Sequence, residues 1–188
     1  MKIIKTKIPG LLIIEPKVYE DARGYFFESY NKSAFEKETL QSNFVQDNQS
    51  KSGYGVIRGL HYQIEPHAQT KLVRTLSGVI YDVAVDIRKG SPTFGQWVGV
   101  EISGENKRQV LIPKGFAHGF SVLSEAAVVF YKCDDFYKPE ADRGIIYNDK
   151  SLNIGWKVKP ENAIVSEKDL QHPTLQEAEN NFVYTHTA

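Results

Sequence analysis

Short stretches in which apolar and polar residues alternate dominate this chain, and they restrict it to folds built from β-strands. The clearest stretch covers residues 79–88, where every second residue from Val79 to Ile87 is apolar or aromatic. Because successive side chains of a strand point to opposite faces, this spacing predicts a strand with one richly apolar face. Similar stretches occupy residues 11–15, 25–30, 44–50, 56–63, 71–76, 96–102, 108–112, 116–122 and 126–133. Many short strands separated by turns predict an all-β sandwich, barrel or jelly roll.

Only two segments are typical of helices, and both are short. Ser33 and Glu36 have the spacing of a capping box, which predicts a helix that extends through Leu40. Residues 174–179 predict another helical turn. The chain from about residue 150 onward is more polar and carries isolated apolar anchors. We expect it to pack back over the strands, within a single domain that spans residues 1–188.

The charge balance and the cysteine content narrow the class of protein. Lysine plus arginine and aspartate plus glutamate both number 23, so the net charge is zero and nothing favours binding to nucleic acid or to a membrane surface. Cys133 is the only cysteine, which excludes an intrachain disulfide and indicates a reducing compartment. Neither a signal peptide nor a membrane-spanning run is recognisable. We therefore expect a cytoplasmic protein.

Residues 58–63 place a guanidinium and an imidazole within one predicted strand. Strict alternation would put Arg58 and His61 on opposite faces. Gly59 lies between them, and a glycine inside a strand often marks a bulge that shifts the phase by one residue. We expect such a break at Gly59, so that both side chains reach one cavity. The alternative is a salt-bridged arginine and a hydrogen-bonded histidine with structural roles only.

Two further clusters could contribute to a binding site. Residues 113–120 place His118 one residue before a glycine, directly after a turn, and residues 21–28 contain Arg23, Phe26 and Glu28. An arginine for a phosphate, an aromatic ring for a base and a carboxylate for ring N–H groups would suit a nucleotide. An ordinary surface turn and a structural histidine would have similar sequences.

A metal-binding jelly roll would need a different histidine pattern. Such sites use two histidines one residue apart on a strand, but the residue two positions after His61 is Gln63. His67 is separated from His61 by Pro66, and His118 has no second ligand beside it. The sequence therefore predicts no metal site.

Taken together and in order, several motifs of this chain resemble those of the dTDP-4-dehydrorhamnose 3,5-epimerase family. The resemblance runs from about residue 5 to residue 170, and it is carried by residues 21–28, 46–48, 58–63, 71–73, 82–88, 91–95 and 113–120 and by Tyr131. It implies a cupin-type jelly roll (double-stranded β-helix) with short peripheral helices, assembled as a homodimer that shares strands across the interface. It also implies an isomerase that needs no cofactor and inverts C3 and C5 of a dTDP-4-keto-6-deoxy sugar in dTDP-L-rhamnose biosynthesis.

The reaction that the resemblance implies has clear chemical requirements. The keto group acidifies the C–H bonds at C3 and C5, so inversion needs a base on one face of the ring, an acid on the other, and a cation near the enolate oxygen. The resemblance implies that His61 is the base and that Asp169 orients it. It also implies that Tyr131 is the acid and that Lys71 stabilises the enolate.

The resemblance further implies a set of substrate-binding residues. Arg23 and Arg58 would clamp the pyrophosphate, and His118 would line the sugar site. The positions that hold the thymidine part match Phe26, Glu28, Gln46, Asp47 and Asn48, and Lys168 is a further substrate-binding residue. Asp142 stands where the family commonly has a glutamate, which leaves open the contact that this shorter carboxylate makes.

Other functions remain compatible with the same architecture. They are a C3-only or C5-only epimerase, a 3,4-ketoisomerase, a metal-dependent cupin oxygenase or isomerase, and a non-catalytic module that binds a nucleotide sugar. The ketoisomerases lack the full set of histidine, lysine and tyrosine, whereas His61, Lys71 and Tyr131 are all present here. Their joint presence also argues against a module that only binds.

Overall fold

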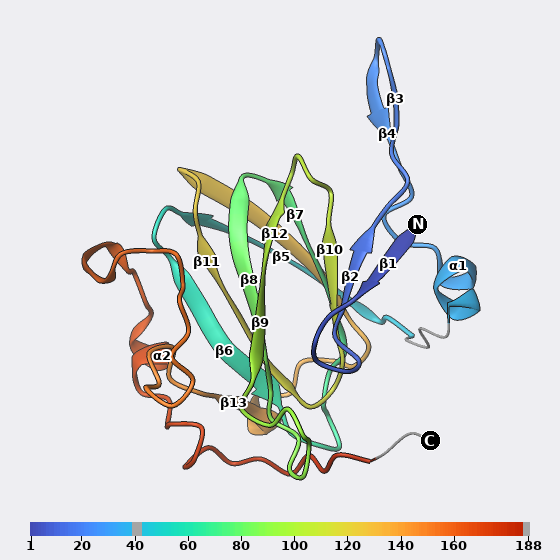
Figure 1. Cartoon of the computed structure of the whole chain (residues 1–188). Coiled ribbons are helices and arrows are strands. Elements are labelled where there is room, and N and C mark those ends of the chain that lie inside the picture. Colours follow the sequence, from blue (N-terminus) through green and yellow to red (C-terminus); the bar gives the residue numbers. More distant parts are fainter. Residues whose placement is uncertain (39–42, 186–188) are drawn as a thin grey trace.

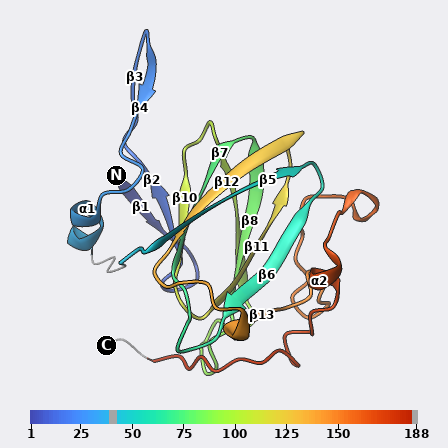
Figure 2. The ribbon, with the colours of Figure 1, turned by 180° about the vertical axis from the view of Figure 1, so that it is seen from behind.

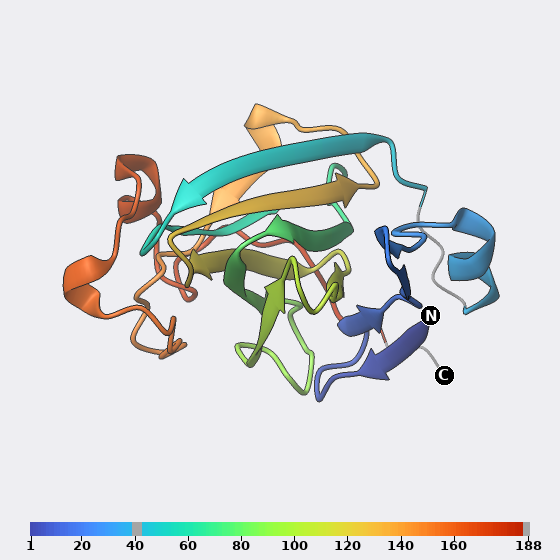
Figure 3. The same cartoon turned by 90° about the horizontal axis from the view of Figure 1, so that it is seen from above.

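A computed structural model describes residues 1–38 and 43–185 and shows two antiparallel β-sheets that face each other (Figure 1 and Figure 3). The first sheet has the strand order β1 (Lys2–Lys5), β2 (Leu12–Glu15), β10 (Gln109–Ile112), β7 (Lys71–Ser77), β12 (Ala126–Cys133) and β5 (Gln46–Gly53). The second has the order β13 (Asp142–Gly144), β6 (Ile57–Gln63), β11 (Phe116–Val122), β8 (Val79–Asp86) and β9 (Trp97–Ser103). The crossovers between the sheets give the predicted jelly roll.

The predicted strands all overlap strands of the structure, and the all-β fold class is confirmed. Three strands were not predicted: β1, β13 and β3 (Tyr19–Asp21). The last pairs with β4 (Gly24–Phe26), which is shorter than the predicted strand over residues 25–30. Together β3 and β4 form a hairpin that projects away from the two sheets (Figure 1 and Figure 2).

The predicted helices are partly wrong. Helix α1 (Lys32–Lys37) is capped by Asn31, whose side chain accepts a hydrogen bond from the Ala34 N–H, and not by Ser33. Leu40 lies outside the described residues. Residues 174–179 form turns, in which Thr174 donates its hydroxyl hydrogen bond to Glu177, and no helix. In the described parts of the chain no helix is long and apolar enough to cross a membrane.

Three short helical elements lie in the chain that follows β12. The 3₁₀ turns η1 (Pro139–Ala141) and η2 (Pro160–Asn162) both begin with a proline, whose fixed φ suits the first turn of a helix. Helix α2 (Glu167–Leu170) begins after Ser166, whose Oγ accepts a hydrogen bond from the Asp169 N–H at 3.1 Å. This helix lies beside β6 in both views of the molecule (Figure 1 and Figure 2).

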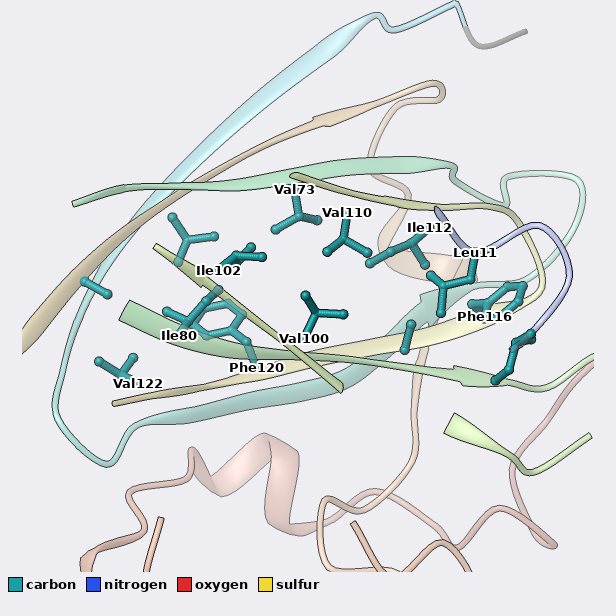
Figure 4. Close-up of a cluster of buried hydrophobic side chains, with 14 residues drawn as sticks. Leu11, Val73, Ile80, Val100, Ile102, Val110, Ile112, Phe116, Phe120 and Val122 are labelled. Atoms are coloured by element: carbon teal, nitrogen blue, oxygen red, sulfur yellow. The ribbon is translucent and has the colours of Figure 1, made fainter. Parts of the chain in front are cut away.

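One apolar core fills the space between the two sheets (Figure 4). Its buried side chains come from both sheets and from the turn before β2: Ile8, Leu11, Val73, Ile80, Ala84, Val100, Ile102, Val110, Ile112, Phe116, Phe120, Val122, Ala127 and Val129. Along two strands of this face the core gives way to polar groups. On β12, Val129 is followed at every second position by Tyr131 and Cys133, and on β7 Lys71 precedes Val73. One end of the sandwich is therefore apolar and the other can hold a polar cavity.

Strand β8 is buried on both faces, which the sequence pattern did not indicate. Its richly apolar face, with Tyr81, Val83, Val85 and Ile87, points away from the sandwich interior and packs against a second cluster. That cluster includes Trp156 and other side chains of the chain after β13. The other face carries Asp82 between the core residues Ile80 and Ala84. Because the C-terminal part of the chain covers the apolar face, the polar position of β8 is turned inward.

Candidate active site

The polar end of the sandwich contains two adjoining hollows. The larger has a volume of about 410 Å³ and the smaller about 240 Å³. Both are lined by Asn48, His61, Lys71 and Tyr131. His61 comes from one sheet and the other three from the facing sheet, so the two hollows form one cavity between opposing walls.

His61 and Asp169 form a hydrogen-bonded dyad at one wall of the cavity. The His61 Nε2 atom lies 2.8 Å from Asp169 Oδ1, and the Asp169 side chain is buried on α2. Since Nε2 is engaged, Nδ1 is the ring nitrogen that can exchange a proton with a molecule in the cavity. The structure thus brings together two residues far apart in the sequence, in the arrangement of a general base and its orienting carboxylate.

The hydrogen bonds around Asp169 keep it ionised. Burial by itself raises the pKa of this carboxyl group, but the hydrogen bond from His61, the charge of its imidazolium form and the Gly59 N–H lower the pKa to about 2. The Gly59 N–H donates to Oδ2 at 3.1 Å. The carboxylate is therefore held from both oxygens and can stabilise a protonated His61.

A bulge at Gly59 explains why Arg58 and His61 reach the same cavity. His61 pairs with His118 of β11 and Arg58 pairs with Phe120, so two residues of β6 lie opposite one residue of β11. Gly59 has a φ of +110°, and a Cβ there would lie 2.6 Å from the backbone of Gly119 and of His118. Only glycine fits this position. The predicted break in alternation is confirmed.

Tyr131 and Lys71 occupy the wall opposite the dyad. They lie on the neighbouring strands β12 and β7, and the Lys71 Nζ atom is 5.9 Å from the centre of the Tyr131 ring. Burial raises the pKa of Tyr131 and the nearby Cys133 raises it further, so the phenol carries its proton. Burial lowers the pKa of Lys71. A proton donor and a lysine amine thus face the base across the cavity.

His118 belongs to a second histidine–carboxylate pair. Its Nε2 atom lies 2.7 Å from Oδ2 of Asp82, and both residues are buried. The other carboxylate oxygen of Asp82 has no hydrogen-bond partner in the structure. His118 lines the smaller hollow together with Arg58, whose Nε donates to Ser52 Oγ at 3.0 Å.

The predicted nucleotide-binding segment on β5 divides between the two faces of its strand. Gln46 and Asn48 line the larger hollow and are joined by a hydrogen bond of 3.0 Å. Asp47 is turned to the opposite face, where it pairs with Lys132 at 2.9 Å. Its side chain does not reach the cavity, because neighbouring residues of a strand point to opposite sides.

Asp142 and Lys168 meet at the rim of the larger hollow. The Lys168 Nζ atom lies 2.6 Å from Asp142 Oδ2, and this hydrogen bond raises the pKa of Lys168. The Tyr137 hydroxyl donates to the same oxygen at 3.4 Å. The Asp142 carboxylate therefore organises two other groups at the rim.

Arg23, Phe26 and Glu28 lie away from the cavity of their own chain. Arg23 sits in the turn of the β3–β4 hairpin and pairs with Asp21 at 2.6 Å, with 90% of its side chain exposed. Phe26 is 69% exposed on the same hairpin, and Glu28 accepts a hydrogen bond from Asn31. Within one chain, the structure does not bring these predicted binding residues to the dyad.

The histidines within residues 1–38 and 43–185 do not form the pattern of a metal-binding jelly roll. Gln63, at the position where a second histidine would be needed, donates to the His67 carbonyl at 2.6 Å and accepts from the Lys138 N–H at 2.7 Å. His61, Asp169 and His172 do place three atoms of the kind that bind metals within 4.8 Å of one another. The dyad hydrogen bond and the packing of the two rings account for this cluster, and we assign it no metal.

Three residues near the cavity were missed by the sequence analysis. Asp82 could have been noticed as a carboxylate inside an otherwise apolar strand, and His172 as the residue three positions after Asp169. Tyr137, which lines the larger hollow, carries no local signal because it lies in an irregular segment after β12.

A jelly roll that holds a histidine–carboxylate base, a protonated phenol and an ammonium group on facing walls of one cavity defines an acid–base isomerase of the cupin type. Residues 5–177 match the sequence pattern of the family described as dTDP-4-dehydrorhamnose 3,5-epimerase. The chain belongs to this family, as its motifs implied, and it is an epimerase.

Individual relatives agree with this family over nearly the whole chain. The dTDP-4-dehydrorhamnose 3,5-epimerase of Shigella flexneri is 56% identical over 180 residues, which is 95% of this chain and 98% of the relative. The crystal structure of the enzyme of the same name from Elizabethkingia anophelis has a TM-score of 0.91 at 53% identity, covering 94% and 97% of the two chains. The dTDP-6-deoxy-D-glucose-3,5-epimerase from Legionella pneumophila, solved with dTDP-4-keto-L-rhamnose, has a TM-score of 0.89 at 54% identity, covering 94% and 93%.

Proposed function

We propose that the chain converts dTDP-4-dehydro-6-deoxy-D-glucose to dTDP-4-dehydro-L-rhamnose by inverting C3 and C5, in dTDP-L-rhamnose biosynthesis. The observation that carries this proposal is the placement of the His61–Asp169 dyad and of Tyr131 on opposite walls of one cavity. Inversion requires a proton to leave one face of the sugar ring and another to arrive at the opposite face. The relative from Legionella pneumophila was solved with the corresponding product.

In the proposed first step, His61 Nδ1 takes the proton from a carbon next to the keto group. The electron pair of the broken C–H bond moves toward the keto oxygen and forms an enolate. Lys71 supplies positive charge at this oxygen, where the negative charge of the transition state develops. Asp169 stabilises the imidazolium that results.

In the second step, the Tyr131 hydroxyl gives its proton to the same carbon from the other face. The raised pKa of Tyr131 keeps this proton in place until the enolate has formed. His61 then loses its proton to solvent and Tyr131 regains one from solvent, which restores both groups. Repeating the two steps at the second carbon inverts both centres. No redox step is involved, because each centre loses and regains a proton at an unchanged oxidation level.

The remaining cavity residues suit the nucleotide. Arg58 supplies a planar fork of N–H donors that matches two phosphate oxygens. Gln46 and Asn48 offer amide donors and acceptors in the larger hollow, with the Tyr137 ring beside them. The Lys168–Asp142 pair supplies charged groups at the rim.

We further propose that the protein acts as a homodimer in which the β3–β4 hairpin of each chain reaches the cavity of its partner. The hairpin projects from its own chain and exposes Tyr19, Tyr25 and Phe26 by 55%, 57% and 69%. Large apolar side chains gathered on one projecting element favour burial against another chain. In this arrangement Arg23, Phe26 and Glu28 would complete the nucleotide site of the partner.

We also propose that residues 1–188 act as one domain in the cytoplasm. The packing of Trp156 and Phe182 against the outer face of β8 supports a single unit. Cys133 is a buried free thiol, and a single unpaired cysteine is typical of proteins in a reducing compartment.

Proton NMR of the 4-keto-6-deoxyglucose nucleotide in deuterated water tests the activity directly. We expect deuterium to appear at both C3 and C5 when the protein is added without any other enzyme, because each inversion replaces a carbon-bound hydrogen by a solvent hydrogen. Deuterium at one carbon only would make the protein a C3-only or C5-only epimerase. Tight binding of dTDP without any exchange would make it a binding module.

Mixing two defective variants tests the exchange of hairpins. Arg23→Ala should lower kcat/KM by about 10 to 100 fold, the range for losing a charged hydrogen bond to phosphate. His61→Ala should be inactive. If the hairpin acts in the partner's cavity, a mixed dimer has one site with both defects and one intact site, so an equal mixture of co-refolded chains should regain about one quarter of the wild-type activity. Activity that stays at the mean of the two variants would place Arg23 in its own chain's site.

A further inference from the structure

His172 lies next to both members of the catalytic dyad. Its ring meets that of His61 edge to face, with the ring centres 5.6 Å apart and the planes at 77°. Its Nε2 atom lies 3.6 Å from Oδ1 of Asp169, the same oxygen that binds His61. Only 12% of the side chain is exposed, and neither of the two hollows is lined by it.

The space for the His172 ring depends on a glycine in the neighbouring strand. Gly144 of β13 is the Cα partner of His61 in the pairing of β13 with β6. A Cβ at Gly144 would lie 2.3 to 2.5 Å from the Nε2, Cδ2 and Cε1 atoms of His172. Real Cβ contacts are not this short, so the absence of a side chain at position 144 creates the slot that holds the ring against the dyad.

The Nε2 atom of His172 is buried and has no hydrogen-bond partner within normal distance. The charged and titratable groups that surround it are His61 on β6, Asp169 and Lys168 on α2, and Asp142 on β13. Burial, and then the charge of His61, lower the pKa of His172, so its ring is neutral when His61 accepts a proton. A neutral ring with its hydrogen on Nε2 turns its positive edge to the Asp169 carboxylate, which is the favourable tautomer here.

We propose that His172 is a positioning residue for the epimerase reaction, which packs against the His61 ring and limits the negative charge that Asp169 presents to it. This inference rests on the proposed function of the dyad as the general base. Because the Nε2 edge of the His172 ring faces the same Asp169 oxygen at 3.6 Å, it offsets part of the negative charge that this carboxylate presents to His61. The contact therefore acts on the angle of the base and on the acid limb of the activity.

Three variants separate the two parts of this role. His172→Ala removes both the ring and the polar edge, and we expect kcat to fall by about 10 to 100 fold while KM stays within about twofold, since small displacements of a reacting group have effects of this size. His172→Phe keeps a ring but loses the N–H, so the acid limb of kcat/KM should move to higher pH. His172→Gln keeps an amide N–H near the Nε2 position, so its acid limb should stay where the wild-type limb lies.

The NMR signals of the His61 imidazole, recorded in each variant at one pH, give a readout that a purely structural role would not change. We expect these signals to shift in His172→Phe and to stay at their wild-type positions in His172→Gln. His67→Ala is the matched control, because His67 forms an imidazole–carboxylate pair with Asp135 at 3.5 Å outside the cavity. It should leave kcat and the pH profile unchanged.

Two results would overturn the inference. One is a His172→Ala protein with wild-type kcat, or with a changed KM alone. The other, which decides the matter if the alanine variant does not fold, is an acid limb that is the same in the wild type, His172→Phe and His172→Gln. If the wild-type protein itself exchanged no hydrogens with solvent, the proposed function would fail, and the NMR signals of the His61 imidazole would still show whether His172 acts on the dyad.

Discussion

Replacing His61 by alanine should lower the rate of hydrogen exchange at C3 and C5 by about 10² to 10⁴ fold, the usual contribution of a general base. His61 is the imidazole that both lines the cavity and bonds to an ionised carboxylate whose pKa is held near 2. Without it, the described cavity walls retain His118, but that ring is bonded to Asp82. Deuterium incorporation from solvent, followed by NMR under single-turnover conditions, measures the loss.

Two controls make the His61→Ala result specific. Calorimetric binding of dTDP should be close to that of the wild type, because the cavity residues proposed to bind the nucleotide are untouched. Thermal unfolding should show a folded protein, since His61 is partly exposed and its loss leaves no cavity in the apolar core. A folded variant that exchanges hydrogens at nearly the wild-type rate would remove His61 from the role of base.

Replacing Tyr131 by phenylalanine should separate hydrogen exchange from inversion. His61 can still remove the proton and return one from the same face, so deuterium should continue to enter the sugar. The opposite face has lost its acid, and the rate of inversion should fall by about 10² to 10⁴ fold. The ratio of deuterated unchanged sugar to inverted product, read from one NMR time course, measures the separation.

A matched control for this variant is Tyr54→Phe, which deletes the same hydroxyl from a tyrosine that is 45% exposed outside the cavity. It should change neither rate. Equal loss of exchange and inversion in Tyr131→Phe would contradict the division of labour between the two walls. Tyr131 would then act on the first proton transfer as well, for example through the dipole of its hydroxyl group near Lys71.

The strands could be predicted because alternation is a local property. Strands β6 and β11 were predicted to within one residue, and the bulge was predicted from the single glycine between Arg58 and His61. The helix caps and the short helices were harder to predict from the sequence. Helix α1 is capped by Asn31 and not by Ser33, because both residues can cap and only the tertiary path of the chain decides between them. Helix α2 is a single turn, too short to leave a periodic pattern.

Site residues could be predicted where they lie on a strand that lines the cavity, as Lys71 and Tyr131 do. They were missed where their position depends on how a distant part of the chain packs against a strand. Asp82 faces the interior because the C-terminal chain covers the more apolar face of β8. His172 approaches His61 because Gly144 leaves a slot in β13. Asp47 was predicted to bind the nucleotide only because it belongs to the same motif as Gln46 and Asn48. Those two residues face the cavity, whereas Asp47 points to the other side of the strand.

The carboxylate that orients the base is delivered by the same segment that covers the outer face of β8. Residues 61 and 169 are separated by 108 positions, and Ile164 forms a bridge to Val56 just before helix α2. The dyad cannot form until this segment has docked, because Asp169 lies within it. Docking of the C-terminal segment therefore does two things at once: it buries the outer face of β8 and it supplies the base with its orienting carboxylate.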